Sequence, residues 1–376
     1  MNTDGGLSHK LHGLDHLRAF AITYVFLYHY GRFFPHPEWT NTLTRFGWSG
    51  VDLFFVLSGY LIAAQLFKSM ATYKTFSLRD FFIKRFFRII PIYLVIVVIY
   101  FLFPFVRERE SPAPLWKYLT FTQNINLDIA KQGTFSHSWS LCIEEQFYLL
   151  LPFILLGLMK LKLFKKAYWL LAVLFISGLA VRIVLHSNLE SDNDWLTWYK
   201  WIYFPTWSRL DGLLVGVSIA ALLQFRPAFS KRILVHEKTL LLTGIIIFAV
   251  SHYICSNQIS FKSSVFGLPL TDIGYGFIVL SALSPKSFLY KYESKTTSKI
   301  ATLSYGIYLI HKMVVHVAQP QVAKFDINNE SNLMFIICTG IVFLSALLLN
   351  QIIEKPFLQL RSRLLVKTKR LYKSIQ

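Results

Sequence analysis

The feature that most constrains this chain is a series of long apolar segments separated by short polar ones. The ten segments cover residues 14–33, 48–67, 88–106, 139–159, 167–186, 204–224, 239–256, 265–284, 301–319 and 333–353. A helix needs about 20 apolar residues to cross a bilayer, and it satisfies its own backbone hydrogen bonds there. Only 16% of the residues are charged, below the quarter found in soluble domains. We therefore predict an all-α integral membrane protein, a bundle of about ten transmembrane helices.

The distribution of lysine and arginine predicts the topology. If the N-terminus is cytoplasmic, inside segments hold 26 of these residues and outside segments hold 9. This bias follows the positive-inside rule and places both termini in the cytoplasm. It also explains the net charge of +19 through contact with anionic membrane lipid, so we expect no nucleic-acid partner. We expect a multi-pass protein of the cell (inner) membrane without a cleavable signal.

The domain organisation follows from the same pattern. We expect a cytoplasmic N-terminal segment at 1–13, one transmembrane domain at 14–356 and a basic cytoplasmic tail at 357–376, with no additional catalytic domain. The three cysteines lie far apart in apolar segments, which gives neither a disulfide framework nor metal-ligand spacing. We expect no metal site and no bound cofactor.

Arginines gather at the predicted inner ends of two segments. Arg18 enters the first segment from the cytoplasm, and Arg85 and Arg88 are three residues apart, hence on one helical face. Guanidinium groups match phosphate oxygens, so the cluster could bind a polyphosphate. Anionic lipid head groups are the alternative ligand, and the pattern alone favours them.

Ionisable and polar side chains from four segments reach a second layer near the predicted outer surface. They are His29, Asp52, Ser140, Glu144, Glu145 and Arg209. Charged groups in a membrane are costly and usually mark a functional site. His29 follows Arg18 by eleven residues, about three helical turns, so both lie on nearly one face. The two interpretations are a catalytic site around His29 and a structural network of interhelical hydrogen bonds.

The ninth segment carries two weaker candidates. Tyr305 lies near its inner end, where tyrosine is commonly an interfacial residue, and His311 lies near its middle beside Lys312. Two basic groups at mid-membrane must face the bundle interior or water.

Six sequence elements in order resemble the acyltransferase 3 family of multi-pass O-acyltransferases, which includes O-antigen acetylases. They are LDHLR (14–18), the Arg18–His29 spacing, GVDLFFVLSGY (50–60), Arg85 with Arg88, WSLCIEEQFY (139–148), and SYGIYLIH (304–311) followed by EKP (354–356). The resemblance covers most of the chain. His16 and Tyr60 depart from the family pattern at positions to which we assign no chemistry.

The resemblance implies transfer of an acyl group, usually acetyl, from cytoplasmic acyl-CoA to a hydroxyl of an extracytoplasmic or lipid-linked carbohydrate. Acyl-CoA would be a co-substrate, its phosphates held by Arg18, Arg85 and Arg88. His29 would be the general base. Glu144, or failing that Asp52, would orient it.

The remaining roles are less determined. Arg209 would stabilise the tetrahedral intermediate, and the secondary candidates are Ser140, Glu145, Tyr305 and His311. No nucleophile motif such as G-x-S-x-G is present, which favours direct transfer, and a relay through histidine or tyrosine stays open. The competing class is a polytopic transporter or a flippase of lipid-linked saccharides, without bond chemistry.

Overall fold

The computed structural model describes residues 11–188 and 194–375, and its regular elements are helical. The long helices are α1 (His12–Phe33), α3 (Gly50–Tyr73), α4 (Leu78–Leu102), α6 (Trp139–Lys160), α7 (Ala167–Asn188), α9 (Asp211–Phe225), α11 (Glu237–Ile254), α12 (Leu268–Leu283), α14 (Lys295–Ala323), α15 (Asn332–Leu349) and α16 (Lys355–Ile375). Short helices are α2 (Trp39–Thr44), α5 (Leu115–Leu119), α8 (Trp195–Trp198), α10 (Pro227–Leu234) and α13 (Phe288–Lys291). Each predicted apolar segment overlaps one long helix, so the all-α prediction is confirmed.

The predicted number of ten membrane crossings is not confirmed. In the described part of the chain, eight helices are long and apolar enough to cross a bilayer, or nine if α9 and α10 form one span broken by a 111° bend. Helix α1, which carries charged residues together with several histidines and tyrosines, falls outside this set. The side of the membrane on which each terminus lies stays a prediction. The N-terminal segment that we predicted lies, for residues 1–10, outside the described residues.

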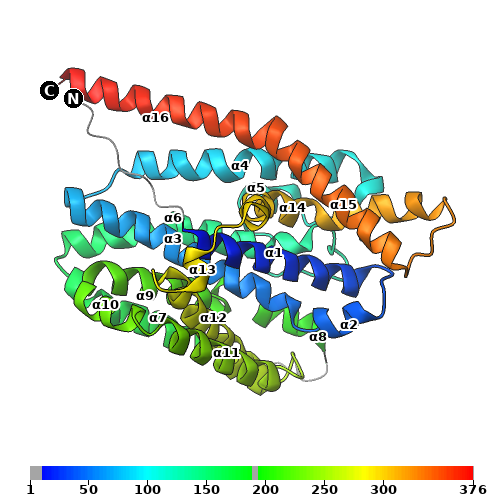
Figure 1. The fold of residues 1–376 in the computed structure, drawn as a ribbon, viewed down its shortest axis with the longest axis horizontal. Coiled ribbons are helices and arrows are strands. Elements are labelled where there is room, and N and C mark those ends of the chain that lie inside the picture. Colours follow the sequence, from blue (N-terminus) through cyan, green and yellow to red (C-terminus); the bar gives the residue numbers. More distant parts are fainter. Residues whose placement is uncertain (1–10, 189–193, 376) are drawn as a thin grey trace.

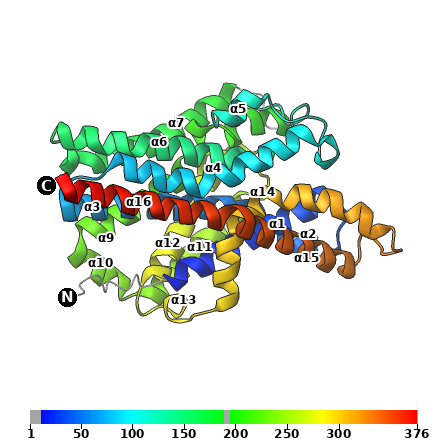
Figure 2. The ribbon, with the colours of Figure 1, turned by 90° about the horizontal axis from the view of Figure 1, so that it is seen from above.

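The long helices run roughly together, and the basic connections gather at one end of the bundle. In Figures 1 and 2, the left end of the bundle holds the C-terminal ends of α3 and α6, the start of α4, and helix α10. The right end holds α2 and the connection from α14 to α15. The ends that carry the lysine-rich and arginine-rich connections therefore lie together, as the positive-inside pattern requires.

Glycines allow α3 and α9 to pack closely at the centre of the bundle. A Cβ added at Gly59 would lie 2.2 Å from the carbonyl oxygen of Leu213, and one added at Gly216 would lie 2.2 Å from that of Val56. Close approach through small residues is the usual way in which membrane helices associate. This packing fixes the residues that α3 and the segment before α9 present to the interior.

Two boundaries differ from the sequence prediction. Helix α4 begins at Leu78 rather than at residue 88, because the Ser77 side chain caps it by accepting from the Asp80 amide at 3.1 Å. Arg85 and Arg88 therefore lie inside the helix. The segment predicted as a tail continues from α15 through a π-helical turn at Asn350–Glu354 into α16, which packs along α4 (Figures 1 and 2).

The long connection from α4 to α6 folds back over the bundle. The Tyr118 hydroxyl donates to the Thr134 carbonyl at 3.1 Å, and the hydroxyl of Tyr93 on α4 donates to the Tyr118 carbonyl at the same distance. Burial raises the pKa of Tyr118, which keeps its hydroxyl a donor. These hydrogen bonds hold the connection against α4, so that its residues line one side of a cavity next to α1 and α14.

Candidate active site

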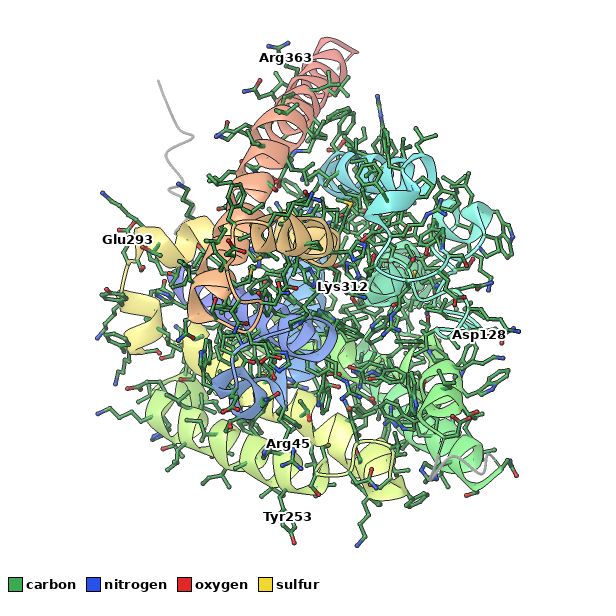
Figure 3. The ribbon with its side chains drawn as sticks, turned by 90° about the vertical axis from the view of Figure 1, so that its right-hand side faces the viewer. Arg45, Asp128, Tyr253, Glu293, Lys312 and Arg363 are labelled. Carbon is green, nitrogen blue, oxygen red and sulfur yellow. The ribbon has the colours of Figure 1, made fainter. Side chains whose placement is uncertain are left out.

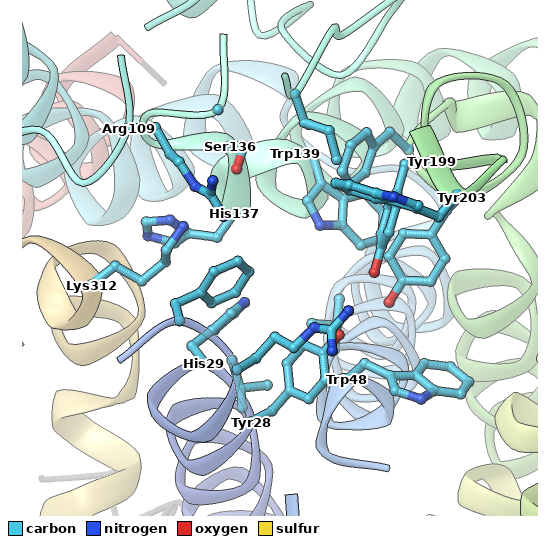
Figure 4. Close-up of a pocket in the computed structure, with 18 of the residues that line it drawn as sticks. Tyr28, His29, Trp48, Arg109, Ser136, His137, Trp139, Tyr199, Tyr203 and Lys312 are labelled. Carbon is cyan, nitrogen blue, oxygen red and sulfur yellow. The ribbon is translucent and has the colours of Figure 1, made fainter. Parts of the chain in front are cut away.

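A cavity of about 540 Å³, which we call the histidine cavity, opens between α1, α6, α14, the α4–α6 connection and the segment around α8. Figure 4 shows two unlike walls: His29, His137, Arg109 and Lys312 on one side, and Tyr28, Trp48, Trp139, Tyr199 and Tyr203 on the other. Aromatic faces favour stacking against the apolar faces of a ring-shaped ligand, and the basic wall favours polar or anionic groups. The cavity therefore suits a ligand with an apolar ring face on one side and polar groups on the other.

Three imidazole rings from three elements meet at the basic wall. His311 Nε2 lies 2.9 Å from His29 Nδ1, and the ring centroid of His137 lies 5.0 Å from that of His311 and 5.9 Å from that of His29. The sequence placed His311 only among the secondary candidates. The structure makes it the direct partner of His29.

The hydrogen bonds of His311 determine the tautomer of His29. His311 Nδ1 lies 2.9 Å from the carbonyl oxygens of Ile307 and of Tyr308, and these groups only accept, so Nδ1 carries a proton. In neutral His311, Nε2 then accepts, and His29 Nδ1 donates to it. Neutral His29 is left with an unprotonated Nε2. A histidine in this state can take a proton.

A buried ion pair stands behind the histidines. Lys312 Nζ lies 3.2 Å from Glu108 Oε1, and the two side chains are 2% and 4% exposed. The same oxygen lies 4.0 Å from His137 Nδ1. In the end-on view of Figure 3, Lys312 lies in the middle of the bundle, whereas Tyr253 and Arg363 lie at its rim. A cation in this position favours negative charge in the cavity.

Asp52 and Arg209 lie together behind the aromatic wall and do not line the cavity. Their side chains form an ion pair at 2.5 Å, and both are buried. The Arg209 guanidinium stacks over the ring of Tyr203 at 4.7 Å and that of Trp139 at 5.8 Å. The pair therefore supports two residues of the aromatic wall, and its predicted part in the chemistry stays a prediction.

A second cavity of about 450 Å³, the arginine cavity, brings Arg18, Arg85 and Arg88 together at the end where the basic connections gather. Lys84 from α4 and Arg361 from α16 also line it. Arg18, Arg85 and Arg88 were predicted to form one cluster, and they do. The concentration of cationic groups suits a ligand with several phosphates.

Glu144 belongs to the arginine cavity rather than to the histidine cavity. Its Oε2 accepts from the Tyr148 hydroxyl at 2.7 Å and from the Ser58 hydroxyl at 2.9 Å, and Arg85 stacks on Tyr148 at 5.4 Å. The structure therefore does not bring Glu144 to His29. Our expectation that it orients His29 assumed that the two side chains meet because they lie at a similar depth.

Two other predicted residues, Tyr305 and Ser140, line the same cavity, and Glu145 does not. Tyr305 lines it and donates to the Ile89 carbonyl at 3.0 Å, and Ser140 lines it with its hydroxyl 2.6 Å from that of Tyr308. Glu145 has a buried carboxylate oxygen, Oε1, without a hydrogen-bond partner in the described structure.

The two cavities are neighbours. Val51 and Tyr308 line both of them, and the Tyr308 hydroxyl donates to the His137 carbonyl. Val51 and Tyr308 thus lie where the cavity that holds the arginines borders the cavity that holds the histidines.

Sequence reasoning missed several residues that the structure brings to the site. Among them, His137 and Arg109 line the histidine cavity, Arg361 lines the arginine cavity, and Glu108 forms the ion pair with Lys312. His137 stands in a polar Ser-His-Ser sequence directly before Trp139, a signal that could have been used. Arg361 lies in the segment read as a tail. Within the described residues, no group of three or more His, Cys, Asp or Glu side chains is arranged to hold a metal ion.

Comparison with known proteins adds independent findings. A family model described as an acyltransferase domain matches residues 11–351. The chain is 30% identical over 325 residues to the O-acetyltransferase OatA of Staphylococcus aureus, covering 81% of this chain and 50% of that protein. It is 28% identical over 366 residues to the peptidoglycan O-acetyltransferase OatA of Listeria monocytogenes, a match that covers 91% of this chain and 55% of that protein. The chain thus spans about half the length of these relatives. No solved structure matches it.

Proposed function

The chain belongs to the acyltransferase 3 family, and from this premise we propose that it is a membrane O-acyltransferase. It moves an acyl group, acetyl to judge from the names of its relatives, from cytoplasmic acyl-CoA to a hydroxyl of an extracytoplasmic or lipid-linked glycan. The peptidoglycan named for one relative makes a cell-wall saccharide the proposed acceptor. The observation that carries the proposal is the pair of neighbouring cavities, one rich in arginine and one in histidine.

The arginine cavity is the proposed donor site. Arg18, Arg85 and Arg88 bind the phosphates of acetyl-CoA, which requires this end of the bundle to face the cytoplasm, where acyl-CoA is found. The thioester end then extends past Tyr308 and Val51 toward His29. Glu144 accepts hydrogen bonds from Ser58 and Tyr148, and it therefore helps to position the side chains of the arginine cavity rather than His29.

The histidine cavity is the proposed site of acceptor binding and reaction. The saccharide stacks on the aromatic wall with its hydroxyl at His29 Nε2. His29 takes the hydroxyl proton as the oxygen attacks the thioester carbonyl, and it then gives the proton to the departing CoA thiolate. The Lys312 cation, which lines the cavity, favours the negative charge on the tetrahedral intermediate. Arg209 and Asp52 hold Tyr203 and Trp139 in place.

The test is a reconstituted transfer assay. Purified protein in liposomes, supplied with acetyl-CoA and a soluble peptidoglycan fragment on opposite sides, is expected to release CoA thiol and to acetylate the fragment in equal amounts. Each substrate alone gives neither product. A transporter or flippase would move the saccharide without releasing thiol, and that result would refute the proposal.

A further inference from the structure

An apolar groove of about 1190 Å³ lies apart from both cavities, between α6, α7, α9 and α12. Most of its lining consists of leucine, isoleucine, phenylalanine and alanine side chains. In a membrane, such a groove faces hydrocarbon, so acyl chains rather than water fill it.

The groove exists because α7 is fixed to the bundle by one half only. The buried residues of α7 are Gly178, Arg182 and His186, all in its second half. Arg182 donates at 2.5 Å both to the Asp211 carboxylate and to the Ser208 carbonyl. Residues 167–176, in the first half, include no buried side chain, and many of them line the groove. The ion pair therefore anchors one end of α7 and leaves the other end apart from α9.

One mouth of the groove is basic. Lys165, just before α7, and Arg226, just after α9, line it at the end of the bundle that also carries the arginine cavity. Both side chains are exposed, and neither forms an ion pair with a carboxylate in the described part of the chain. Two such cations at the end of an apolar groove complement a ligand with an anionic head and apolar chains.

We propose that this groove binds an anionic glycerophospholipid, its acyl chains between α6, α7 and α9 and its phosphate at Lys165 and Arg226. The ligand fills the gap beside α7 and links this helix to the bundle. The site does not depend on the proposed transfer reaction. Each basic residue near an anionic lipid strengthens binding about fivefold, so loss of both weakens binding about 30-fold.

The first experiment compares charge variants by native mass spectrometry of the delipidated full chain. Phosphatidylglycerol is expected to bind more tightly than phosphatidylcholine of equal chain length. The Lys165→Gln/Arg226→Gln variant should lose about 30-fold in phosphatidylglycerol affinity. The control Lys286→Gln/Lys291→Gln, which removes two exposed lysines that line none of these cavities, should retain it. Equal binding of the two lipids, or unchanged affinity in the first variant, would overturn the proposal.

The second experiment fills the groove without changing charge. Ala172→Trp places an indole in the groove and should displace phosphatidylglycerol, whereas Val173→Trp, at a neighbouring position that is 59% exposed and does not line the groove, should not. Retention of the lipid by Ala172→Trp would overturn the proposal. So would a stable dimer of the purified chain whose interface covers the groove, because a second copy would then be the occupant.

Discussion

Arg209 was expected to stabilise the tetrahedral intermediate, whereas the structure pairs it with Asp52 behind the aromatic wall, and the variant Arg209→Met distinguishes these two roles. Arg209 and Asp52 form a pair at 2.5 Å with side chains 1% and 0% exposed. Removal of one member of a buried ion pair costs about 3–5 kcal/mol, because the other charge stays buried without a partner. The guanidinium also bonds Asp52 through one nitrogen only, while its Nε and Nη1 have no partner in the described structure. Because a single hydrogen bond joins the pair, we expect a cost at the lower end of this range, about 3 kcal/mol.

Loss of the stacking on Tyr203, at 4.7 Å, adds about 1 kcal/mol. We therefore expect Arg209→Met to lower the free energy of unfolding by about 4 kcal/mol. With an unfolding entropy scaled to 376 residues, this corresponds to a decrease in Tm of about 5 °C.

The assay is thermal unfolding of the purified protein together with transfer per folded molecule. The double variant Asp52→Asn/Arg209→Met should recover most of the lost stability, because it leaves no unpaired charge. The control Arg45→Met, at an exposed position, should change stability by less than about 0.5 kcal/mol. If Arg209→Met keeps normal stability but loses transfer about 100-fold per folded molecule, Arg209 acts on the reaction and our reasoning is refuted.

Three further predictions follow from the two cavities and the topology. Arg85→Ala and Arg88→Ala should each raise the KM for acetyl-CoA about 10-fold, so that a higher donor concentration restores part of the activity. An unchanged KM in steady-state assays would place the donor site elsewhere. A cysteine at position 117 should react with an impermeant maleimide only from outside and one at 162 only from inside; the reverse pattern would contradict both cavity assignments. Lys312→Met leaves the buried Glu108 carboxylate without its partner and should lower the free energy of unfolding by about 3 kcal/mol, as measured by thermal unfolding. An unchanged Tm would mean that the Lys312–Glu108 pair is not buried in the membrane.

The helices and the arginine cluster could be predicted from sequence because both depend on local spacing. Apolar length defines each helix, and Arg85 and Arg88 share a face wherever α4 lies. The positive-inside pattern then predicted the depth of each residue in the membrane, with Arg18 near the inner surface and His29 near the outer surface. These three kinds of information need no knowledge of which helices are neighbours.

The partners of His29 could not be predicted, because depth along a helix does not say which helix lies beside it. Glu144 and His29 were expected at one level, yet α6 turns Glu144 toward Ser58 and the arginine cavity. Asp52 instead meets Arg209, since Gly59 and Gly216 bring α3 and α9 into close contact. His311 reaches His29 because α14 packs on α1.

The central claim is that His29 accepts the proton of the acceptor hydroxyl, and the variant His29→Gln tests it most directly. Glutamine keeps hydrogen bonding and approximate volume but cannot act as a base at neutral pH. We predict a 10²–10⁴-fold fall, roughly, in transfer per folded molecule, with unchanged acetyl-CoA binding and insertion. His316→Gln, on α14 but outside both cavities, should transfer normally. An interhelical hydrogen bond contributes only about 0.6 kcal/mol, so near-normal transfer by His29→Gln would show that His29 merely joins α1 to α14, and the account would be wrong.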